Sequence, residues 1–452
     1  MQITIIGAGY VGLVSGVCLA ELGMHVTCVD KDIDKIRRLT KGEVPIYEPG
    51  LDALIAKNMQ ENRLHFSIVL SEAVSNADVV LIAVGTPPSP KDGKADLSYV
   101  YACAEEIAQS LTQKTVIVTK STVPVGTGQQ IKQRMTAANP SAEFTIASNP
   151  EFLREGSAIG DFMKPDRIVI GTQDADTAAI MSQLYAPLAE QGYRLLHTDV
   201  ETAEMIKYAS NSFLATKIAF INEMADICEQ VGANVELVAK GMGMDERIGE
   251  RFLRPGPGFG GSCFPKDAMA LARLAKEHGI KPNIVNAVID YNLGRRESMV
   301  DRIVTACGSV KDKSIAILGL TFKANTDDMR ESPSLSIIPK LHKMGARLRL
   351  YDPEGMENAK KHFTQSGITW CESVEDAVDA VDAAVIVTEW DIFRQMELPT
   401  IHEQMFTPLI IDLRNLFIPD SMAEQGFDYY SIGRKPALGA QLKQMPSHAA
   451  ST

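Results

Sequence analysis

The residue best suited to covalent chemistry is Cys263, because glycines precede it and charged residues follow it. Three glycines lie between positions 258 and 261, and Pro265 suits the first turn of a helix that starts beside the cysteine. The helix dipole and the neighbouring Lys266 both favour the thiolate, which is the nucleophilic form. Asp267, four residues on, can share a helix face with the sulfur. The stretch predicts a reactive cysteine; the alternative is a small buried apolar side chain, which we expect for the other six cysteines.

A glycine-rich turn near the start of the chain has the spacing of a dinucleotide-binding loop. Gly7, Gly9 and Gly12 follow a short apolar strand and open a helix, and Asp30 ends the next strand. The first glycine permits a tight turn, the second lets a pyrophosphate approach the positive helix end, and the third lets helix and strand pack closely. Asp30 can accept both ribose hydroxyls and repel a 2′-phosphate, so NAD is favoured over NADP. The alternative is a purely structural turn.

Two polar residues interrupt the apolar face of a long predicted helix, Glu201 to Val231, which has no internal Gly or Pro. Lys207 and Asn211 lie about 40° apart around the helix axis, on the face that carries Ile221. A buried ammonium is costly without a partner, so these side chains should point into a cleft or the interior. The alternative is a lysine that extends along apolar surface to reach water.

Polar residues also follow two strands of the expected sheet, at the edge where open α/β folds bind ligands. Glu151 and Glu155 lie in the loop after the strand that ends near Ser148, and Thr122 follows the strand at 115–119. The two glutamates are spaced for one helical face, and the alternative to a ligand site is the solvated start of a helix. Thr122 can offer a hydroxyl to a cofactor or to water.

The chain is acidic overall, so an anionic ligand would need a local cluster of basic residues. The net charge is 45 − 57 = −12, which makes non-specific nucleic-acid binding a poor prediction. Each of these cations alone is expected at the surface, but together they suggest a phosphate-bearing substrate. They are Arg247, Arg251 and Arg254 before the cysteine, Lys323 and Arg330 after a turn at Gly319, and Arg414 after a late strand.

Strands alternate with helices in both halves of the chain, which is typical of parallel sheets covered on both faces. We therefore expect an α/β fold of two doubly wound, Rossmann-like domains joined by the long central helix. The expected strands lie at 3–6, 25–29, 79–84, 115–119 and 145–148, and again at 314–318, 347–351, 383–388 and 409–412.

The expected domains follow from this repeat. Residues 1–200 form an NAD-binding domain and 201–304 a central helical domain with the long helix and the cysteine loop. Residues 305–437 form a second Rossmann-like domain, which lacks the full glycine set and should bind a different ligand. Residues 438–452 are small and polar and are expected to be a disordered tail.

The composition is ordinary for a soluble globular protein. Of the 452 residues, 45% are hydrophobic, and no apolar run approaches the ~20 residues of a membrane-spanning helix. The N-terminus reads as a strand rather than a signal peptide. Seven scattered cysteines with no C-x-x-C pair indicate reduced thiols in the cytoplasm and no zinc or other metal site. With no long apolar run, we expect no membrane partner.

Four motifs together resemble the UDP-glucose/GDP-mannose dehydrogenase family. They are Gly-Ala-Gly-Tyr-Val-Gly at 7–12, Asn-Pro-Glu-Phe-Leu-Arg-Glu-Gly at 149–156, Gly-Phe-Gly-Gly-Ser-Cys-Phe-Pro-Lys-Asp at 258–267, and Phe-Lys-Ala-Asn-Thr-Asp-Asp-Met-Arg-Glu-Ser at 322–332. The resemblance covers the chain from Met1 to about Gly433. Ser262 before Cys263 is unlike the Gly-Gly-His-Cys pattern of UDP-N-acetylmannosamine dehydrogenases.

The resemblance implies a four-electron oxidation of a primary alcohol to a carboxylate, with two NAD reduced per sugar. An aldehyde needs a tetrahedral adduct before it can give up a second hydride, and the Cys263 thiolate would supply it as a thiohemiacetal and then a thioester. Lys207 and Asn211 would stabilise the developing negative oxygen. Asp267 would position water or act as a base, Glu151 would assist hydrolysis and Thr122 would hold a water.

The resemblance also implies a set of binding residues and an oligomer. Arg247 would reach a neighbouring subunit's site, so a homodimer or a larger homo-oligomer is expected. UDP-glucose is the expected substrate; the alternatives are GDP-mannose as substrate or a non-catalytic NAD-binding protein with an inert cysteine. The expected NAD contacts are Gly7, Gly9, Tyr10, Val11, Gly12, Asp30, Lys35, Thr86, Thr122, Glu155, Lys266 and Arg330. The expected substrate contacts are Glu151, Phe152, Leu153, Arg154, Glu155, Lys207, Asn211, Arg247, Phe252, Arg254, Gly258, Gly260, Lys323 and Arg414.

Overall fold

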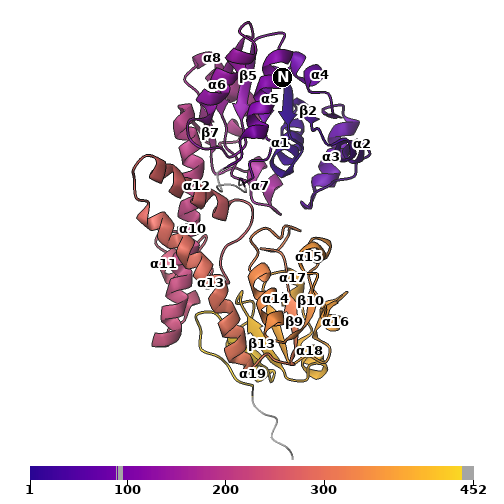
Figure 1. The fold of residues 1–452 in the computed structure, drawn as a ribbon, viewed down its shortest axis with the longest axis vertical. Coiled ribbons are helices and arrows are strands. Elements are labelled where there is room, and N and C mark those ends of the chain that lie inside the picture. The colour runs from indigo at the N-terminus through magenta and orange to yellow at the C-terminus, as the bar shows by residue number, and fades with distance from the viewer. Residues whose placement is uncertain (88, 90–94, 440–452) are drawn as a thin grey trace, which may run out of the picture. The chain divides into compact units, whose positions relative to one another are not determined.

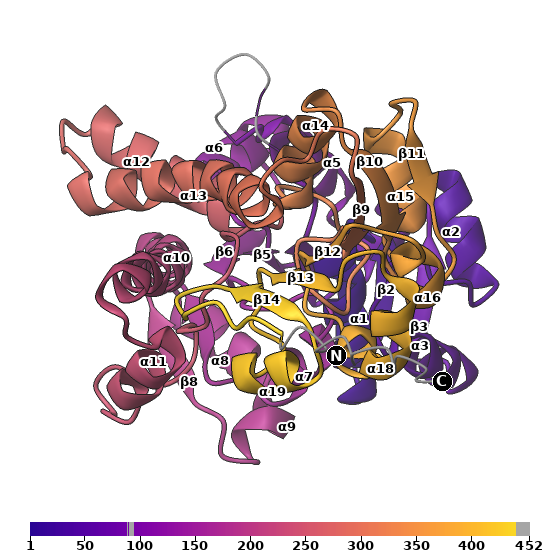
Figure 2. The ribbon, with the colours of Figure 1, turned by 90° about the horizontal axis from the view of Figure 1, so that it is seen from below.

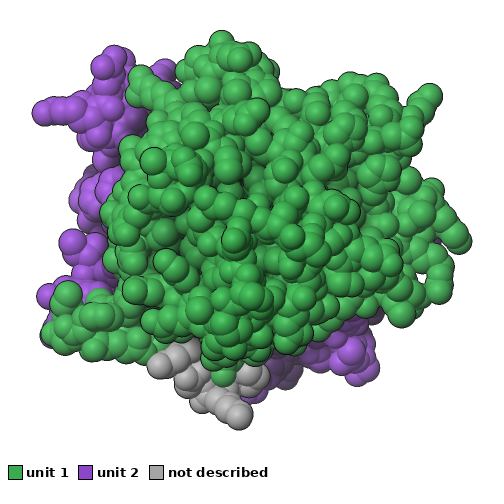
Figure 3. Space-filling model, turned by 90° about the horizontal axis from the view of Figure 1, so that it is seen from above, with its two compact units in different colours: residues 1–211, 270–280 green, residues 212–269, 281–452 purple. Residues whose placement is uncertain are grey.

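The computed structural model describes residues 1–87, 89 and 95–439 (Figure 1). The chain divides into two compact units: Met1–Asn211 with Ala270–Ile280, and Ser212–Met269 with the chain from Lys281 onward. Figure 3 draws the first unit in green and the second in purple. From residue 440 on, the tail expected at 438–452 lies outside the described residues.

The described part of the first unit contains an eight-stranded sheet with the order β3-β2-β1-β4-β5-β6-β7-β8. Its neighbours pair in parallel except β6 and β7, which meet antiparallel through Ser148 and Gly171. The strands predicted from the sequence in this unit pair in parallel, and the antiparallel pair involves β7, which was not predicted. The chain turns back there through the loop that begins at Asn149. The strands are β1 Gln2–Ile6, β2 His25–Val29, β3 Leu64–Ser67, β4 Val79–Ile82, β5 Thr115–Thr119, β6 Phe144–Ser148, β7 Ile168–Gly171 and β8 Leu195–Thr198.

Helices cover both faces of this sheet, as the alternation of strands and helices predicts (Figure 1). One apolar core joins a face of the sheet to α1, α3, α7 and α8, and a second core joins the other face to α4, α5 and α6. The helices are α1 Tyr10–Glu21, α2 Ile33–Thr40, α3 Leu51–Gln60, α4 Leu70–Ser75, α5 Ser98–Ser110, α6 Thr127–Ala138, α7 Ala158–Met163, α8 Ala175–Leu184 and α9 Ala186–Ala189.

The long predicted helix is confirmed as α10, Val200–Val231, whose 32 residues extend over about 48 Å at 1.5 Å per residue. It ends where Gly232 takes a φ of +77°, a conformation that favours glycine. Three more helices follow it: α11 Val235–Gly243, α12 Phe264–Glu277 and α13 Asn283–Cys307. The boundary between the two units falls within α10, after Asn211.

The second unit repeats the strand order of the first six strands of the other sheet. Its order is β11-β10-β9-β12-β13-β14, all parallel, which is the doubly wound arrangement with its reversal between β9 and β12 (Figure 2). The repeat inferred from the sequence is thus confirmed. The strands are β9 Ser314–Leu318, β10 Arg347–Tyr351, β11 Ile368–Trp370, β12 Ala383–Ile386, β13 Leu409–Asp412 and β14 Asp428–Ser431; the helices are α14 Ser334–Lys343, α15 Met356–His362, α16 Val374–Val378, α17 Asp391–Arg394, α18 Leu398–Gln404 and α19 Pro419–Glu424.

Candidate active site

The glycine loop joins β1 to α1 at the point where the first sheet reverses its strand order. Gly7 has a φ of +101°, and a Cβ on Gly12 would lie 1.8 Å from the Gly7 carbonyl oxygen, so both positions need glycine. A Cβ on Gly9, in contrast, would meet nothing within 4 Å. Gly9 precedes Tyr10 and Val11 at the start of α1 and makes no side-chain cap. The loop therefore leaves its second glycine and a positive helix end open to a phosphate, which fits a dinucleotide.

Asp30 lies at the end of β2, beside this loop. Its Oδ2 accepts hydrogen bonds from the Ala8 backbone N–H at 2.9 Å and from Lys35 Nζ at 2.8 Å. Burial raises the pKa of Asp30, but the bond from Lys35 and the backbone donors outweigh it, so the pKa lies below its usual range. The carboxylate is ionised at neutral pH and 11% exposed, which suits a ribose hydroxyl and disfavours a 2′-phosphate.

Loops after β4 and β5 meet through Thr86, whose hydroxyl donates to the Thr122 carbonyl oxygen at 3.0 Å. Both threonines are half-buried. They lie beyond the carboxyl ends of β4, which pairs with β1, and of β5, which pairs with β4. The structure thus brings these two expected cofactor residues together.

Lys207 and Glu151 form a buried ion pair within the first unit. Lys207 Nζ donates to Glu151 Oε1 and to the Glu151 carbonyl oxygen, both at 2.7 Å, and the two side chains are 3% and 4% exposed. Lys207 therefore does not extend to water. Residues 149–154 form no helix, so a solvated helix start was wrong for Glu151. The i, i+4 spacing of the glutamates suggested a helix face, but a partner 56 residues away sets the position of Glu151 instead.

The charge state of Glu151 follows from these contacts. Burial raises its pKa, but the charge and hydrogen bond of Lys207 and the Leu153 backbone N–H, 2.6 Å from Oε2, outweigh burial. The pKa of Glu151 therefore lies below its ordinary value. Asn211, one turn further along α10 than Lys207, is also buried. The site thus holds an ionised carboxylate against an ammonium, away from water.

The rest of the 149–156 loop is tied to the glycine loop by a residue that the sequence did not single out. Glu48 is buried and accepts hydrogen bonds from the Tyr10 hydroxyl, from Gly156 N at 2.7 Å and from Ala158 N at 2.8 Å. Only the tertiary fold brings Glu48 to this loop. Among the other expected residues, Arg154 pairs with Asp161 at 2.6 Å, Phe152 lies under Arg167 at 3.5 Å from the ring centre, and Leu153 and Glu155 are half-buried.

In the second unit, Cys263 immediately precedes α12. All seven cysteines lie in the described chain with free thiols, and Cys263 is the one that is not buried. Burial raises the pKa of Cys18, Cys28 and Cys103 to about 12, which makes those thiols unreactive. The prediction that the other six are buried side chains is confirmed.

The expected neighbours of Cys263 occupy the first turn of α12. Asp267 N donates to the Cys263 carbonyl oxygen at 2.8 Å, which is one helical turn, so both residues lie on one face. The Asp267 side chain is fully buried and accepts a hydrogen bond from Lys266 Nζ at 2.8 Å. The turn therefore presents a thiol, a carboxylate and an ammonium together.

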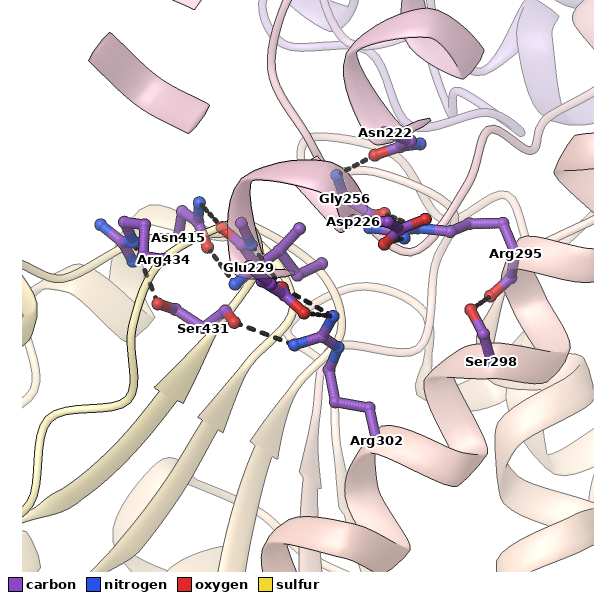
Figure 4. A network of polar contacts seen from close by, with 12 residues as sticks. Asn222, Asp226, Glu229, Gly256, Arg295, Ser298, Arg302, Asn415, Ser431 and Arg434 are labelled. Carbon is purple, nitrogen blue, oxygen red and sulfur yellow. Dashed lines mark hydrogen bonds and ion pairs between the residues drawn. The ribbon is translucent and has the colours of Figure 1, made fainter. Parts of the chain in front are cut away.

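Polar side chains from α10 and α13 hold the cysteine loop, and the sequence did not single them out. Asn292 binds both the N–H and the carbonyl oxygen of Phe259, at 2.8 and 3.0 Å. Gly256 N donates to Asn222 at 2.7 Å, and the Gly256 carbonyl oxygen accepts from Arg295, which also pairs with Asp226 (Figure 4). Asn222 could have been noticed, since it lies three turns beyond Asn211 on the same apolar face.

The cysteine loop packs against the 322–331 segment of the same unit. Gly261 N donates to the Arg330 carbonyl oxygen at 2.8 Å, and a Cβ on Gly260 would lie 2.2 Å from the Glu331 carbonyl oxygen. Arg414 donates to the Phe322 carbonyl oxygen at 2.9 Å. Lys323 lies 5.7 Å from the Phe322 ring centre. Three of the six expected cations thus gather around the cysteine loop.

The other expected substrate residues have different surroundings. Arg247 is 89% exposed and pairs with Asp245, and Arg254 is exposed. Phe252 packs edge-on against Phe264 with ring centres 6.0 Å apart. Gly258 has a φ of +106° and lies against Asn292. Within one copy of the chain, Arg247 and Arg254 therefore lie at the surface, as expected for each of these cations taken alone.

The described residues include no group of three or more His, Cys, Asp or Glu side chains arranged to hold a metal ion. They also include no helix with the length and apolar character needed to cross a membrane.

Three consecutive segments match domains of one family. Residues 1–189 match the NAD binding domain, 201–293 the central domain and 316–419 the UDP binding domain of the UDP-glucose/GDP-mannose dehydrogenase family. The first match includes the glycine loop, Asp30 and Glu151. The second includes Lys207 and Cys263.

Known proteins resemble this chain over nearly its whole length. It is 52% identical to a UDP-glucose 6-dehydrogenase of Rhizobium meliloti, over 96% of this chain and 100% of that protein. It is 48% identical to the UDP-glucose 6-dehydrogenase YwqF of Bacillus subtilis, over 97% and 99%. The solved structure of a UDP-glucose dehydrogenase from Pyrobaculum islandicum superposes with a TM-score of 0.88 at 35% identity, over 96% and 98%. The chain belongs to the UDP-glucose/GDP-mannose dehydrogenase family and is an NAD-dependent oxidoreductase.

Proposed function

We propose that this enzyme oxidises carbon 6 of UDP-glucose to the carboxylate of UDP-glucuronate, with two NAD reduced per sugar. The observation that carries the chemistry is Cys263, a half-buried thiol outside any disulfide, immediately before α12 and with Asp267 one turn away. The names of the 52% and 48% identical relatives support UDP-glucose as substrate. Lys323, Arg330 and Arg414 supply positive charge in the domain that binds UDP in this family.

The first oxidation converts the alcohol to an aldehyde. The glycine loop and Asp30 would hold NAD, which would supply the acceptor for the hydride of carbon 6. The Lys207 ammonium and Asn211 stabilise the oxygen as it gains negative charge, because a donor in a water-excluded site acts more strongly than in water. The alcohol proton passes to a carboxylate of the site, Asp267 or Glu151.

The second oxidation needs the thiol. Cys263 thiolate adds to the aldehyde carbon and forms a carbon–sulfur bond, which gives a thiohemiacetal with a tetrahedral carbon. Loss of a second hydride from that carbon gives a thioester. Water, activated by Glu151 or Asp267, then cleaves the carbon–sulfur bond, which releases the carboxylate and restores the thiol.

Stoichiometry tests this proposal directly. Purified enzyme with UDP-glucose and excess NAD should yield two NADH per sugar and an acid product. One NADH per sugar with accumulating free aldehyde would contradict the covalent step. Faster turnover of GDP-mannose than of UDP-glucose would show that the proposed substrate is wrong, while the proposed chemistry would stand.

We also propose that the enzyme is a homodimer or larger and works in the cytoplasm. The exposed apolar residues of α10, α11 and the turn after α11 include Phe213, Val231, Leu237 and Met244. Arg247 is 89% exposed, so another copy of the chain can contact it. Seven free thiols support a reducing compartment. Light scattering after size-exclusion chromatography measures the oligomer, and a monomer would contradict this assembly.

A further inference from the structure

Lys120, the residue after β5, is a buried cation without a role in the chemistry above. It is 4% exposed. Its Nζ donates to the side-chain oxygen of Asn149 at 2.9 Å and to the Asn149 carbonyl oxygen at 3.4 Å, and lies 5.8 Å from the centre of the Phe162 ring. Amide oxygens offset part of the cost of burying an ammonium, but a nearby anion is needed for the rest.

That anion is Glu151. Burial lowers the pKa of Lys120 to about 8, with Glu151 and the Cys18 thiol of α1 raising it and Lys207 of α10 lowering it. Conversely, the charge of Lys120 helps to lower the pKa of Glu151. Two ammonium groups, Lys120 and Lys207, thus act on one buried carboxylate. Lys207 touches it directly, whereas Lys120 bonds to Asn149, which lies two residues before Glu151.

Asn149 connects Lys120 to Glu151, because its side chain is held by several hydrogen bonds. Its side-chain oxygen accepts from Lys120 and from the Tyr185 hydroxyl, the latter at 2.5 Å, and its Nδ2 donates to the Val169 carbonyl oxygen at 2.7 Å. Its backbone N–H donates to the Thr119 carbonyl oxygen at 3.0 Å. Asn149 is therefore fixed on every side, and Glu151 follows it after one proline.

We infer that Lys120 is a positioning residue of this reaction, whose ammonium fixes the Asn149–Glu151 turn and keeps the Glu151 carboxylate charged. The inference deepens the proposed function, because a charged Glu151 is what thioester hydrolysis requires of a base. Lys120 acts through Asn149 and through its charge, and it takes no part in bond making.

Lys120→Gln separates the charge from the hydrogen bond, and Tyr185→Phe is the matched control. Gln can still donate to Asn149 but carries no charge, whereas Phe removes a different hydrogen bond to the same Asn149 oxygen and leaves the charge. We expect Lys120→Gln to lower kcat about 10-fold or more, with KM for NAD and UDP-glucose within about 3-fold. Its kcat–pH profile should shift its acidic limb upward by about one pH unit, while that of Tyr185→Phe stays in place.

Lys120→Arg is the second variant, because a protein without this buried charge can fail to fold. Arginine stays charged throughout the accessible pH range. Its acidic limb should therefore stay at the wild-type position, whereas that of Lys120→Gln moves upward. An acidic limb that shifts equally in Lys120→Arg and Lys120→Gln, or equal acidic limbs in Lys120→Gln and wild type, would overturn the inference.

The two proposals fail in different ways. If wild-type enzyme does not make two NADH per UDP-glucose, the proposed function is wrong, and the same variants are compared on whichever nucleotide sugar the wild type oxidises. If wild type does so and the limbs of the variants do not move, only the role of Lys120 is wrong.

Discussion

Breaking the buried pair between Lys207 and Glu151 should change stability and catalysis by separable amounts. In Lys207→Met, Glu151 loses two contacts of 2.7 Å and keeps the Leu153 N–H as a donor inside a site that is about 4% exposed. Removal of one partner of a buried ion pair costs about 3–5 kcal/mol. Loss of an oxyanion donor lowers kcat about 10²–10³-fold.

The pH dependence of stability should also reverse its sign for this one group. In wild type the folded pKa of Glu151 lies below the unfolded value of about 4.3, so its contribution is present above that pH and is lost as the pH falls through the folded pKa. In Lys207→Met, burial outweighs the remaining Lys120 charge and Leu153 N–H, and raises the folded pKa of Glu151 above the unfolded one. The carboxyl then favours folding at low pH, and this contribution disappears as the pH rises.

The assay must report on the unit that contains the pair. Both tryptophans, Trp370 and Trp390, lie in the second unit, so their fluorescence is unsuitable. Hydrogen exchange of peptides from β5 and β6, between pH 4 and 8, measures the local stability instead. The double variant Lys207→Met/Glu151→Gln should regain most of the lost stability but not the activity. Wild-type exchange in Lys207→Met, with a change confined to KM, would refute this reasoning.

Four further outcomes are expected. Cys263→Ala should bind NAD and UDP-glucose by calorimetry and form no acid; acid formation at the wild-type rate would exclude the covalent route. Asn292→Ala removes both bonds to Phe259 and should lower kcat by about 10²-fold while NAD affinity stays the same, because it loosens the loop that holds Cys263. Asp30→Asn should weaken NAD and improve NADP relative to it, measured as the ratio of kcat/KM values. Gly12→Ala should reduce soluble folded protein, since the new Cβ would meet the Gly7 carbonyl oxygen at 1.8 Å; a stable variant would contradict that contact.

The sequence predicts those features that local pattern determines. The strand repeat, α10 and the start of α12 follow from apolar periodicity and from glycine and proline positions, and the structure confirms them. The burial of Lys207 follows from its place on an apolar helix face. Its partner does not, because Glu151 lies in a loop whose path depends on a distant lysine. The antiparallel pair of β6 and β7 was missed for the same reason, since strand direction depends on how the intervening loop turns.

The contacts that support the cysteine loop also could not be predicted from the sequence, even for Asn222, whose place on an apolar helix face is a visible signal. The supporting side chains bond to backbone groups more than 30 residues away; they are Asn222, Asn292 and Arg295. A backbone N–H or carbonyl is common to nearly all residues, so the sequence does not identify it as a partner. A polar residue inside a helix signals only that some partner is needed. Which partner it has is decided by the packing of α10 and α13 against the loop, around Phe259.

The two Rossmann-like sheets explain how one repeated fold came to hold two different ligands. Each has a glycine of positive φ after its first strand and an acid after its second, and in each the acid accepts the N–H of the residue after that glycine: Ala8 to Asp30, and Leu320 to Asp352. The next position differs. Gly9 leaves open space, whereas the hydroxyl of Thr321 donates to Asp352 at 3.2 Å.

The surroundings of the second acid complete the difference. Asp352 is 1% exposed and also accepts hydrogen bonds from the indole N–H of Trp390 at 3.1 Å and from Gly355 N at 2.7 Å. A carboxylate has room for about four hydrogen bonds, so Asp352 has no capacity left for a ribose, whereas Asp30 is partly open to solvent. The second unit therefore cannot repeat the dinucleotide contact of the first. We propose that its ligand is bound instead by Lys323, Arg330 and Arg414, which lie beside the cysteine loop.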